Sequence, residues 1–228
     1  MELAKNAIDV GIFTNQRDEQ LAFWQEKVGL PFEELLKTGG GAHQLRHGLN
    51  GSVFKLNHTR VQLRADDPSG YHELLIAREG LKEPVQLEDP DGNLVRLVPV
   101  GWHGVEQIGM VIRVSDVASF QNFYRNILQI EEVTESSFRW GTTLFLLEQS
   151  ETKSRCGGIR GGVGYRYLTV QVWKVDEEHQ AFIERGGAEA QAPMTLGTTA
   201  RISFIEDPDG NWIEISQRAS LTGSLEKG

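Results

Sequence analysis

One acidic side chain near the C-terminus, Glu214, has the type and the position to do chemistry. It follows the segment 207–211 (Asp-Pro-Asp-Gly-Asn) at the start of an apolar run. In a strand here, Ile213 and Ile215 share one face, whereas Trp212 and Glu214 share the other. If the isoleucines pack on helices, Glu214 lines a cavity. A buried carboxylate there could bind a metal, act as a general base with a raised pKa, or pair with an arginine.

Further candidates lie upstream of Glu214. Tyr167 begins a predicted strand over 167–172, where its hydroxyl could donate a proton or hydrogen bond toward Glu214, or belong to an ordinary core tyrosine. Trp173 either lines the cavity or is core. The glycine-rich segment 157–164 precedes a strand, whereas a phosphate-binding loop opens a helix. We interpret it as a flexible connection that covers a pocket and lets Arg160 reach a ligand.

The elements that must position these residues form a repeat. Segment 9–14 lies 100 residues before segment 109–114, and both are β-rich. Segment 87–93 (Leu-Glu-Asp-Pro-Asp-Gly-Asn) matches segment 205–211, where the offset is 118. The first copy therefore lacks about 18 residues (118 − 100), and the matched motif indicates duplication. Asp-Pro-Asp-Gly suits a type I turn between two strands.

Each copy is predicted to run from a strand into an amphipathic helix and then into further strands. The second helix has Ser115 or Asp116 as its N-cap. Strands are expected within 51–63 and 138–147, and the second copy then adds a strand and a helix over 177–184. The first copy has a matching strand over 73–77 but no room for a helix after it. The missing residues therefore correspond to one helix with its turn.

Composition excludes several classes of function. The chain has 228 residues, a net charge of −9 and 39% hydrophobic residues, so it can form packed cores and lacks the basic character of nucleic-acid-binding proteins. No apolar run approaches the roughly 20 residues that span a membrane. The N-terminus lacks the features of a signal peptide, and one cysteine, Cys156, cannot form an internal disulfide. These features predict a cytoplasmic protein.

Paired βαβββ modules with this turn motif and a glutamate three residues after it resemble the vicinal oxygen chelate (VOC) superfamily. That superfamily includes glyoxalase I, extradiol dioxygenases and bleomycin-resistance proteins. The resemblance implies an α+β fold of tandem βαβββ modules that form two curled mixed-sheet domains, the first truncated. We assign residues 1–100 to a degenerate domain, 105–218 to a complete one, and 219–228 to a C-terminal tail.

The resemblance also implies a divalent metal held by two histidines and a glutamate. In the second copy these positions are Gly109, Tyr167 and Glu214, with Glu148 as the nearest match to a further glutamate. The first copy offers Asp9, then His72 or Glu73, then Arg96 at the corresponding positions. Both sites therefore lack the usual ligands, and a metal held by Glu214 and Glu148 stays an open alternative.

Two hypotheses follow for the function. The first is a small-molecule enzyme (lyase, isomerase or dioxygenase) with its pocket in the second copy, where Glu214 and Tyr167 are catalytic. Arg113, which matches a position that binds the glutathione carboxylate in glyoxalase I, would bind substrate together with Glu148, Trp173 and Arg160. The second is a metal-free ligand-binding protein of the bleomycin-resistance type. Either form is expected as a monomer with an internal pseudo-dimer or as a homodimer.

Overall fold

The computed structural model describes residues 1–65, 68–152, 156–223 and 225. The first copy begins with a strand and a short helix, and that helix continues as one π-helical segment. Its elements are β1 Asp9–Thr14, α1 Arg17–Ala22 with the π-helix Phe23–Lys27, β2 Phe32–Lys37, β3 His43–Leu49, β4 Ser52–His58, β5 Tyr71–Arg78, β6 Val85–Glu88 and β7 Leu94–Pro99.

The second copy repeats this order and adds the helix α3, the strand β13 and the short C-terminal helix α4. Its elements are β8 Ile108–Val114, α2 Val117–Asn122 with the π-helix Phe123–Leu128, β9 Glu131–Thr134, β10 Ser137–Trp140, β11 Thr143–Gln149, β12 Gly164–Gln171, α3 Val175–Glu184, β13 Ala188–Leu196, β14 Ala200–Glu206, β15 Trp212–Arg218 and α4 Ala219–Thr222. Helix α3 and strand β13 lie between β12 and β14, whereas β5 and β6 are joined only by residues 79–84. The second copy is therefore longer here by a helix and an edge strand, and the prediction of one missing helix with its turn accounts for only part of the difference.

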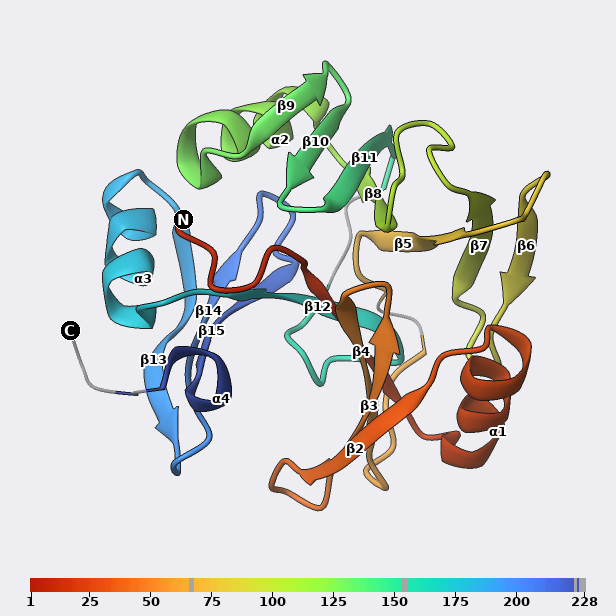
Figure 1. Cartoon of the computed structure of the whole chain (residues 1–228). Helices are drawn as coiled ribbons and strands as arrows, with labels where there is room; N and C mark the ends of the chain where they lie inside the picture. Colours follow the sequence, from red (N-terminus) through yellow and green to blue (C-terminus); the bar gives the residue numbers. More distant parts are fainter. Residues whose placement is uncertain (66–67, 153–155, 224, 226–228) are drawn as a thin grey trace.

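The strands form two sheets in which the two copies exchange halves. The eight-stranded sheet has the order β13-β14-β15-β12-β1-β4-β3-β2, and the seven-stranded sheet has the order β6-β7-β5-β8-β11-β10-β9. Strand β1 pairs antiparallel with β12, and β8 pairs antiparallel with β5. Each sheet therefore combines the first half of one copy with the second half of the other. Figure 1 shows α1 and α3 at opposite sides of the molecule.

Local sequence explains the boundaries of these elements. Asp116 caps α2, because its carboxylate accepts hydrogen bonds from the backbone N–H groups of Ala118 and Ser119. Each Asp-Pro-Asp-Gly segment makes a turn between two antiparallel strands, closed by the N–H of Gly92 or Gly210 donating to the carbonyl of the first aspartate. These turns set the register of β6 with β7 and of β14 with β15.

Alternation along the strands separates an apolar face from a polar one. Ile213 and Ile215 of β15 belong to the main hydrophobic cluster, which also contains aromatic residues of both helices such as Trp24 and Tyr124. Glu214 points to the other face, as the sequence predicts. That face of the eight-stranded sheet is concave and carries most of the buried polar side chains discussed below.

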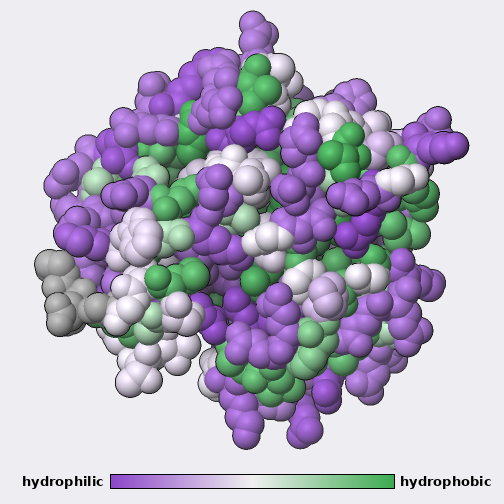
Figure 2. Space-filling model, viewed as in Figure 1, coloured by the Kyte–Doolittle hydropathy of each residue, from purple (hydrophilic) through white to green (hydrophobic). Residues whose placement is uncertain are grey.

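The surface is mostly hydrophilic. In Figure 2 polar and charged residues cover most of the visible face, and apolar residues are scattered between them. The helices of the described residues are all too short or too polar to cross a membrane.

Candidate functional site

The residues proposed from the sequence lie on two different sheets. Tyr167 of β12 and Glu214 of β15 belong to the eight-stranded sheet, whereas Arg113 of β8 and Glu148 of β11 belong to the seven-stranded sheet. The prediction that these four residues line one pocket within the second copy is therefore wrong. The reason is the exchange of halves, because β12 pairs with β1 of the first copy and not with β8.

Glu214 forms a buried ion pair with a lysine from the first copy. The Nζ atom of Lys55, on β4, donates to Glu214 Oε2 at 2.8 Å and to Thr169 Oγ1 at 2.6 Å. The hydroxyl of Thr169 in turn donates to Glu214 Oε2 at 2.6 Å. The Lys55 side chain is 4% exposed and that of Glu214 is 12% exposed. Ammonium, hydroxyl and carboxylate thus form a closed triangle on strands β4, β12 and β15.

Tyr167 lies beside this triangle and contacts amides. Its hydroxyl accepts hydrogen bonds from Asn57 Nδ2 at 3.1 Å and from Gln44 Nε2 at 3.3 Å. Burial, and next the charge of Glu214, raise the pKa of the Tyr167 phenol well above its usual value. The phenol therefore keeps its proton and serves as a neutral hydrogen-bonding group. The Lys55 ammonium lies 5.3 Å from the centre of its ring.

A glycine on β1 makes room for this tyrosine. Gly11 is the register partner of Tyr167, and a β-carbon there would lie 2.2 Å from Tyr167 Cε1. The strand register shifts between Gly11 and Ile12. The tyrosine ring thus covers the backbone of β1, and only glycine fits at this position.

A second carboxylate on the same face also has its own lysine. Asp9 is 1% exposed and is the register partner of Thr169. Its Oδ1 accepts from Lys5 Nζ at 2.7 Å and from the backbone N–H of Val53 at 2.9 Å. Gln171 Nε2 donates to the other oxygen at 3.4 Å. Each carboxylate near the centre of the sheet is therefore neutralised by an ammonium group.

These donors do not fit a divalent metal. On the eight-stranded sheet, the positions that the family resemblance assigns to metal ligands are Asp9 of the first copy and Tyr167 and Glu214 of the second. A phenol that keeps its proton is a poor ligand, and both carboxylates are engaged by lysines. Within the described ranges, no group of three or more His, Cys, Asp or Glu side chains has the arrangement of a metal site.

Ion pairs close one end of the concave face. Glu34 of β2 contacts Arg46 Nε of the neighbouring strand at 3.0 Å, and Arg218 Nη2 of β15 at 3.0 Å. Strands β2 and β15 are separated by four strands in the sheet order, so the second contact shows how strongly the sheet curls. Arg46 also donates to Gln44, which connects this rim to Tyr167. Glu34 is 43% exposed and marks where the polar network reaches solvent.

The concave face of the seven-stranded sheet is different in character. It is filled by an aliphatic cluster, and Gly109 packs against Val105 and Leu75 of that cluster. Arg96, at the position equivalent to Glu214, forms an ion pair with Glu73 at 3.0 Å. The members of the cluster are Leu75, Ala77, Val98, Val105 and Leu144, with Trp102, Val111 and Leu146 packed against them. Polar chemistry is therefore concentrated on the eight-stranded sheet.

The other candidates lie outside this network. Arg113 and Glu148 contact each other at 3.5 Å with about half of each side chain exposed, as a surface ion pair does. Trp173 is 45% exposed in the bend between β12 and α3. Arg160 Nη2 lies 3.5 Å from the carbonyl of Gly39, in the turn between β2 and β3. Cys156 is buried, and burial raises the pKa of its thiol.

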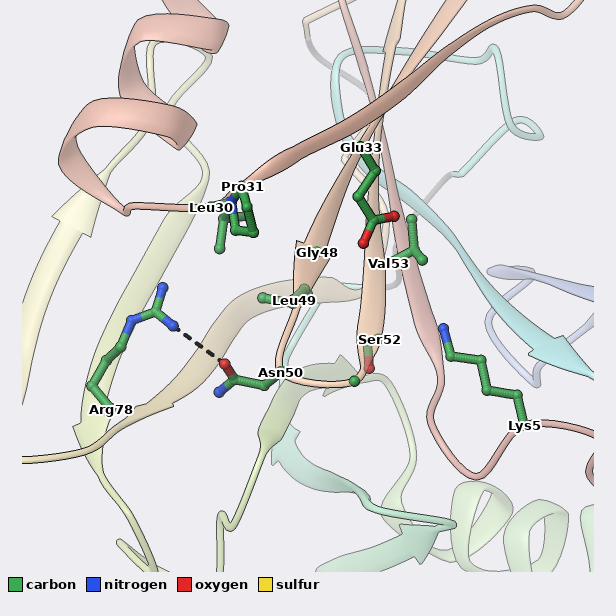
Figure 3. A pocket seen from close by; sticks show the side chains of 11 residues that line it. Lys5, Leu30, Pro31, Glu33, Gly48, Leu49, Asn50, Ser52, Val53 and Arg78 are labelled. Atoms are coloured by element: carbon green, nitrogen blue, oxygen red, sulfur yellow. Dashed lines mark hydrogen bonds between the residues drawn. The ribbon is translucent and has the colours of Figure 1, made fainter.

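Within the described part of the chain, pockets of roughly 300 Å³ or more lie outside the triangle of Lys55, Thr169 and Glu214. One of about 340 Å³ surrounds the β3–β4 turn, with Lys5 and Arg78 on either side of it and Arg78 donating to Asn50 (Figure 3). Another of about 360 Å³ shares Asn50 and Arg78 with it and is also lined by Ala77 and Glu106. The third, of about 310 Å³, lies at the far ends of β3 and β4 and is lined by basic side chains.

Lys55 and Thr169 were not among the sequence candidates, although a signal for Lys55 was present. In β4 (Ser-Val-Phe-Lys-Leu-Asn-His), Phe54 and Leu56 alternate with Lys55 and Asn57. Polar residues at every second position of an otherwise apolar strand indicate a buried polar face. What the sequence could not supply was the pairing of β4 with β1 and β12, which brings Lys55 to Glu214.

The fold and this site define a class of protein with two pseudo-symmetric curled sheets, of which one carries a buried polar centre. Residues 105–215 match the model of the Glyoxalase/Bleomycin resistance protein/Dioxygenase superfamily. This stretch of the chain therefore belongs to the superfamily, and the VOC resemblance seen in the sequence is confirmed. No curated protein matches the chain in sequence.

Solved structures share the fold over nearly the whole chain. Glyoxalase I from Zea mays is 16% identical with a TM-score of 0.71, and the match covers 92% of each chain. A putative dioxygenase from Bacillus subtilis is 12% identical with a TM-score of 0.67, covering 100% of this chain and 92% of the other. The cppA protein from Streptococcus pneumoniae is 12% identical with a TM-score of 0.55, covering 95% and 100%. At these identities the similarity extends to the fold alone.

Proposed function

We propose that this protein binds a small organic molecule on the concave face of the eight-stranded sheet, with Lys55 in the place of a metal ion. The observation that carries the proposal is the contact of Lys55 Nζ with both Glu214 and Thr169. A buried ammonium offers one positive charge at the centre of the sheet. It can therefore attract a carbonyl, enolate or carboxylate oxygen of a ligand.

The surroundings of Lys55 support binding more than turnover. Lys55, Tyr167 and Glu214 each have hydrogen-bonding or ionic partners, and Tyr167 stays protonated. A fully partnered polar network is rigid and pre-organised, which suits recognition. A ligand that enters at Glu34, where the network reaches solvent, has to separate the ion pairs of Glu34 with Arg46 and Arg218.

One contact favours an enzyme as the second candidate. Thr169 Oγ1 lies 2.6 Å from both Lys55 Nζ and Glu214 Oε2. With a substrate that carries a carbonyl, Glu214 could take a proton from the neighbouring carbon while Lys55 stabilises the developing oxyanion. That chemistry is an isomerisation or an elimination through an enolate, and it uses only side chains of this chain.

Binding can be tested with compounds that carry adjacent oxygen atoms, such as 2-oxo acids, hydroxy ketones and catechols. We expect at least one to raise the melting temperature of the protein, and the Lys55→Met variant to lose that response. The Lys82→Met variant, in which an exposed lysine is changed, should keep it. A response that survives in Lys55→Met places binding elsewhere. Following the bound compounds by NMR over hours separates a binding protein, which leaves them unchanged, from an enzyme.

A further inference from the structure

A second polar pocket lies on the opposite face of β3 and β4. Gln44 and Arg46 point to the concave face, so His43 and His47 point away from it by the alternation of the strand. The pocket of about 310 Å³ at the ends of these strands is lined by Arg17, His43, His58 and Arg60, together with Gly40, Gly41, Thr59 and Val61. Among these lining residues, all of them in the described part of the chain, there is no acidic side chain.

Four groups that can carry positive charge converge here in a protein whose net charge is −9. His43 and His58 are register partners on neighbouring strands, so their side chains lie side by side. Burial lowers the pKa of His58, and the nearby charges of Arg17, His43 and Arg60 lower it further, against a smaller opposite effect of Asp18. Such mutual repulsion is relieved when an anion binds between the cations.

The geometry is held in place before any ligand arrives. Asn15 donates to the carbonyls of Thr59 and Val61 at 2.7 and 2.9 Å and accepts from the N–H of Leu63 at 2.9 Å. The Asn15 side chain thus fixes the loop that carries Arg60. On the other side, Gly40 and Gly41 line the pocket in a turn with positive φ, a conformation that glycine adopts readily.

Several polar groups at the pocket lack partners. The Nδ1 atom of His58 is buried and has no hydrogen-bond partner among the described residues. Neither Arg17 nor Arg60 forms an ion pair with another part of the described chain. A fifth cation, Arg160, reaches the rim, where its Nη1 would lie 2.8 Å from a β-carbon added at Gly40.

We propose that this pocket binds a phosphate group carried by a small organic molecule. Two guanidinium groups and two imidazoles match the several oxygens of a phosphate, and arginine binds such groups in a bidentate manner. The volume exceeds what a phosphate ion fills, so there is room for an attached organic group. The site is separate from the Lys55 network and does not depend on the function proposed for it.

The test is calorimetric titration with phenyl phosphate and, separately, with inorganic phosphate, both at fixed ionic strength. We expect saturable binding of phenyl phosphate that weakens roughly tenfold or more in Arg17→Gln and in Arg60→Gln. Lys82→Gln, which removes the same charge from an exposed site, should change affinity less than about twofold. If inorganic phosphate binds as tightly, the phosphate group alone is recognised, and the phosphate site stands without the organic part.

Two results would overturn the proposal. One is the absence of saturable binding up to about 10 mM of either compound, or equal competition by chloride and sulfate at matched ionic strength. The other comes from wild-type protein alone and needs no variant. In a two-dimensional ¹H–¹⁵N spectrum, phenyl phosphate should shift the amide signals of residues 40–43 and 58–61, and shifts confined to other regions contradict the site.

Discussion

Replacing Lys55 by methionine tests the centre of the eight-stranded sheet. Methionine keeps most of the length and apolar volume of the lysine stem but removes its ammonium group. Glu214 would keep only the hydrogen bond from Thr169, at 2.6 Å, and its carboxylate is 12% exposed. The variant therefore leaves a negative charge in the sheet without its ion-pair partner.

The expected loss of stability follows from that burial. Removing one member of a buried ion pair costs about 3–5 kcal/mol, because the other charge stays desolvated. We expect the lower end, about 3 kcal/mol at pH 8, since Thr169 still donates to Glu214 and some solvent reaches it.

Urea unfolding of wild type, Lys55→Met and the surface variant Lys82→Met at pH 8 measures this difference. Adding Glu214→Gln to Lys55→Met should recover part of the lost stability, because no uncompensated charge then remains. The reasoning is refuted if Lys55→Met is within about 0.5 kcal/mol of Lys82→Met at pH 8, or if Glu214→Gln makes the variant less stable still.

Two further predictions follow from close packing and from a buried acid. Gly11→Ala should destabilise the protein by about 1–3 kcal/mol in urea unfolding, because the added β-carbon would meet the Tyr167 ring. An unchanged urea midpoint would contradict this prediction and mean that the ring can move aside. Burial raises the pKa of Asp207 from 3.8 to about 7, so the folded state holds a proton that the unfolded chain has released. The free energy of unfolding should therefore be roughly 2–3 kcal/mol larger at pH 5 than at pH 8 because of this group. This pH dependence should be absent in Asp207→Asn. Equal pH dependence of the free energy of unfolding in both proteins would contradict the raised pKa.

The sequence alone indicates most of the fold, for reasons that are local. The repeated turn motif, the Asp116 cap and the apolar alternation in Ile213 and Ile215 each depend on neighbours in the chain. Subtraction also shows that the first copy is shorter, but the sequence analysis assigned the difference to one helix, whereas the structure shows the helix α3 and the strand β13. The face to which Glu214 points is likewise set by the period of a strand.

The composition of the site could not be obtained in the same way. Which half of each copy joins which sheet depends on long-range pairing, here of β1 with β12 and of β5 with β8. Without that pairing, Glu214 was grouped with Arg113 and Glu148, which lie on the other sheet. The sequence shows Lys55 as a polar position within β4. It does not show that Glu214, 159 residues further along the chain, is the partner of Lys55.

The metal content of the purified protein tests the central claim most directly. We propose that Lys55 occupies the place where a metal ion would otherwise meet Glu214. Elemental analysis of protein prepared without chelators, with and without added zinc, nickel, manganese or iron, should find far less than one metal ion per chain. A stoichiometric ion that disappears in Glu214→Gln would contradict the account.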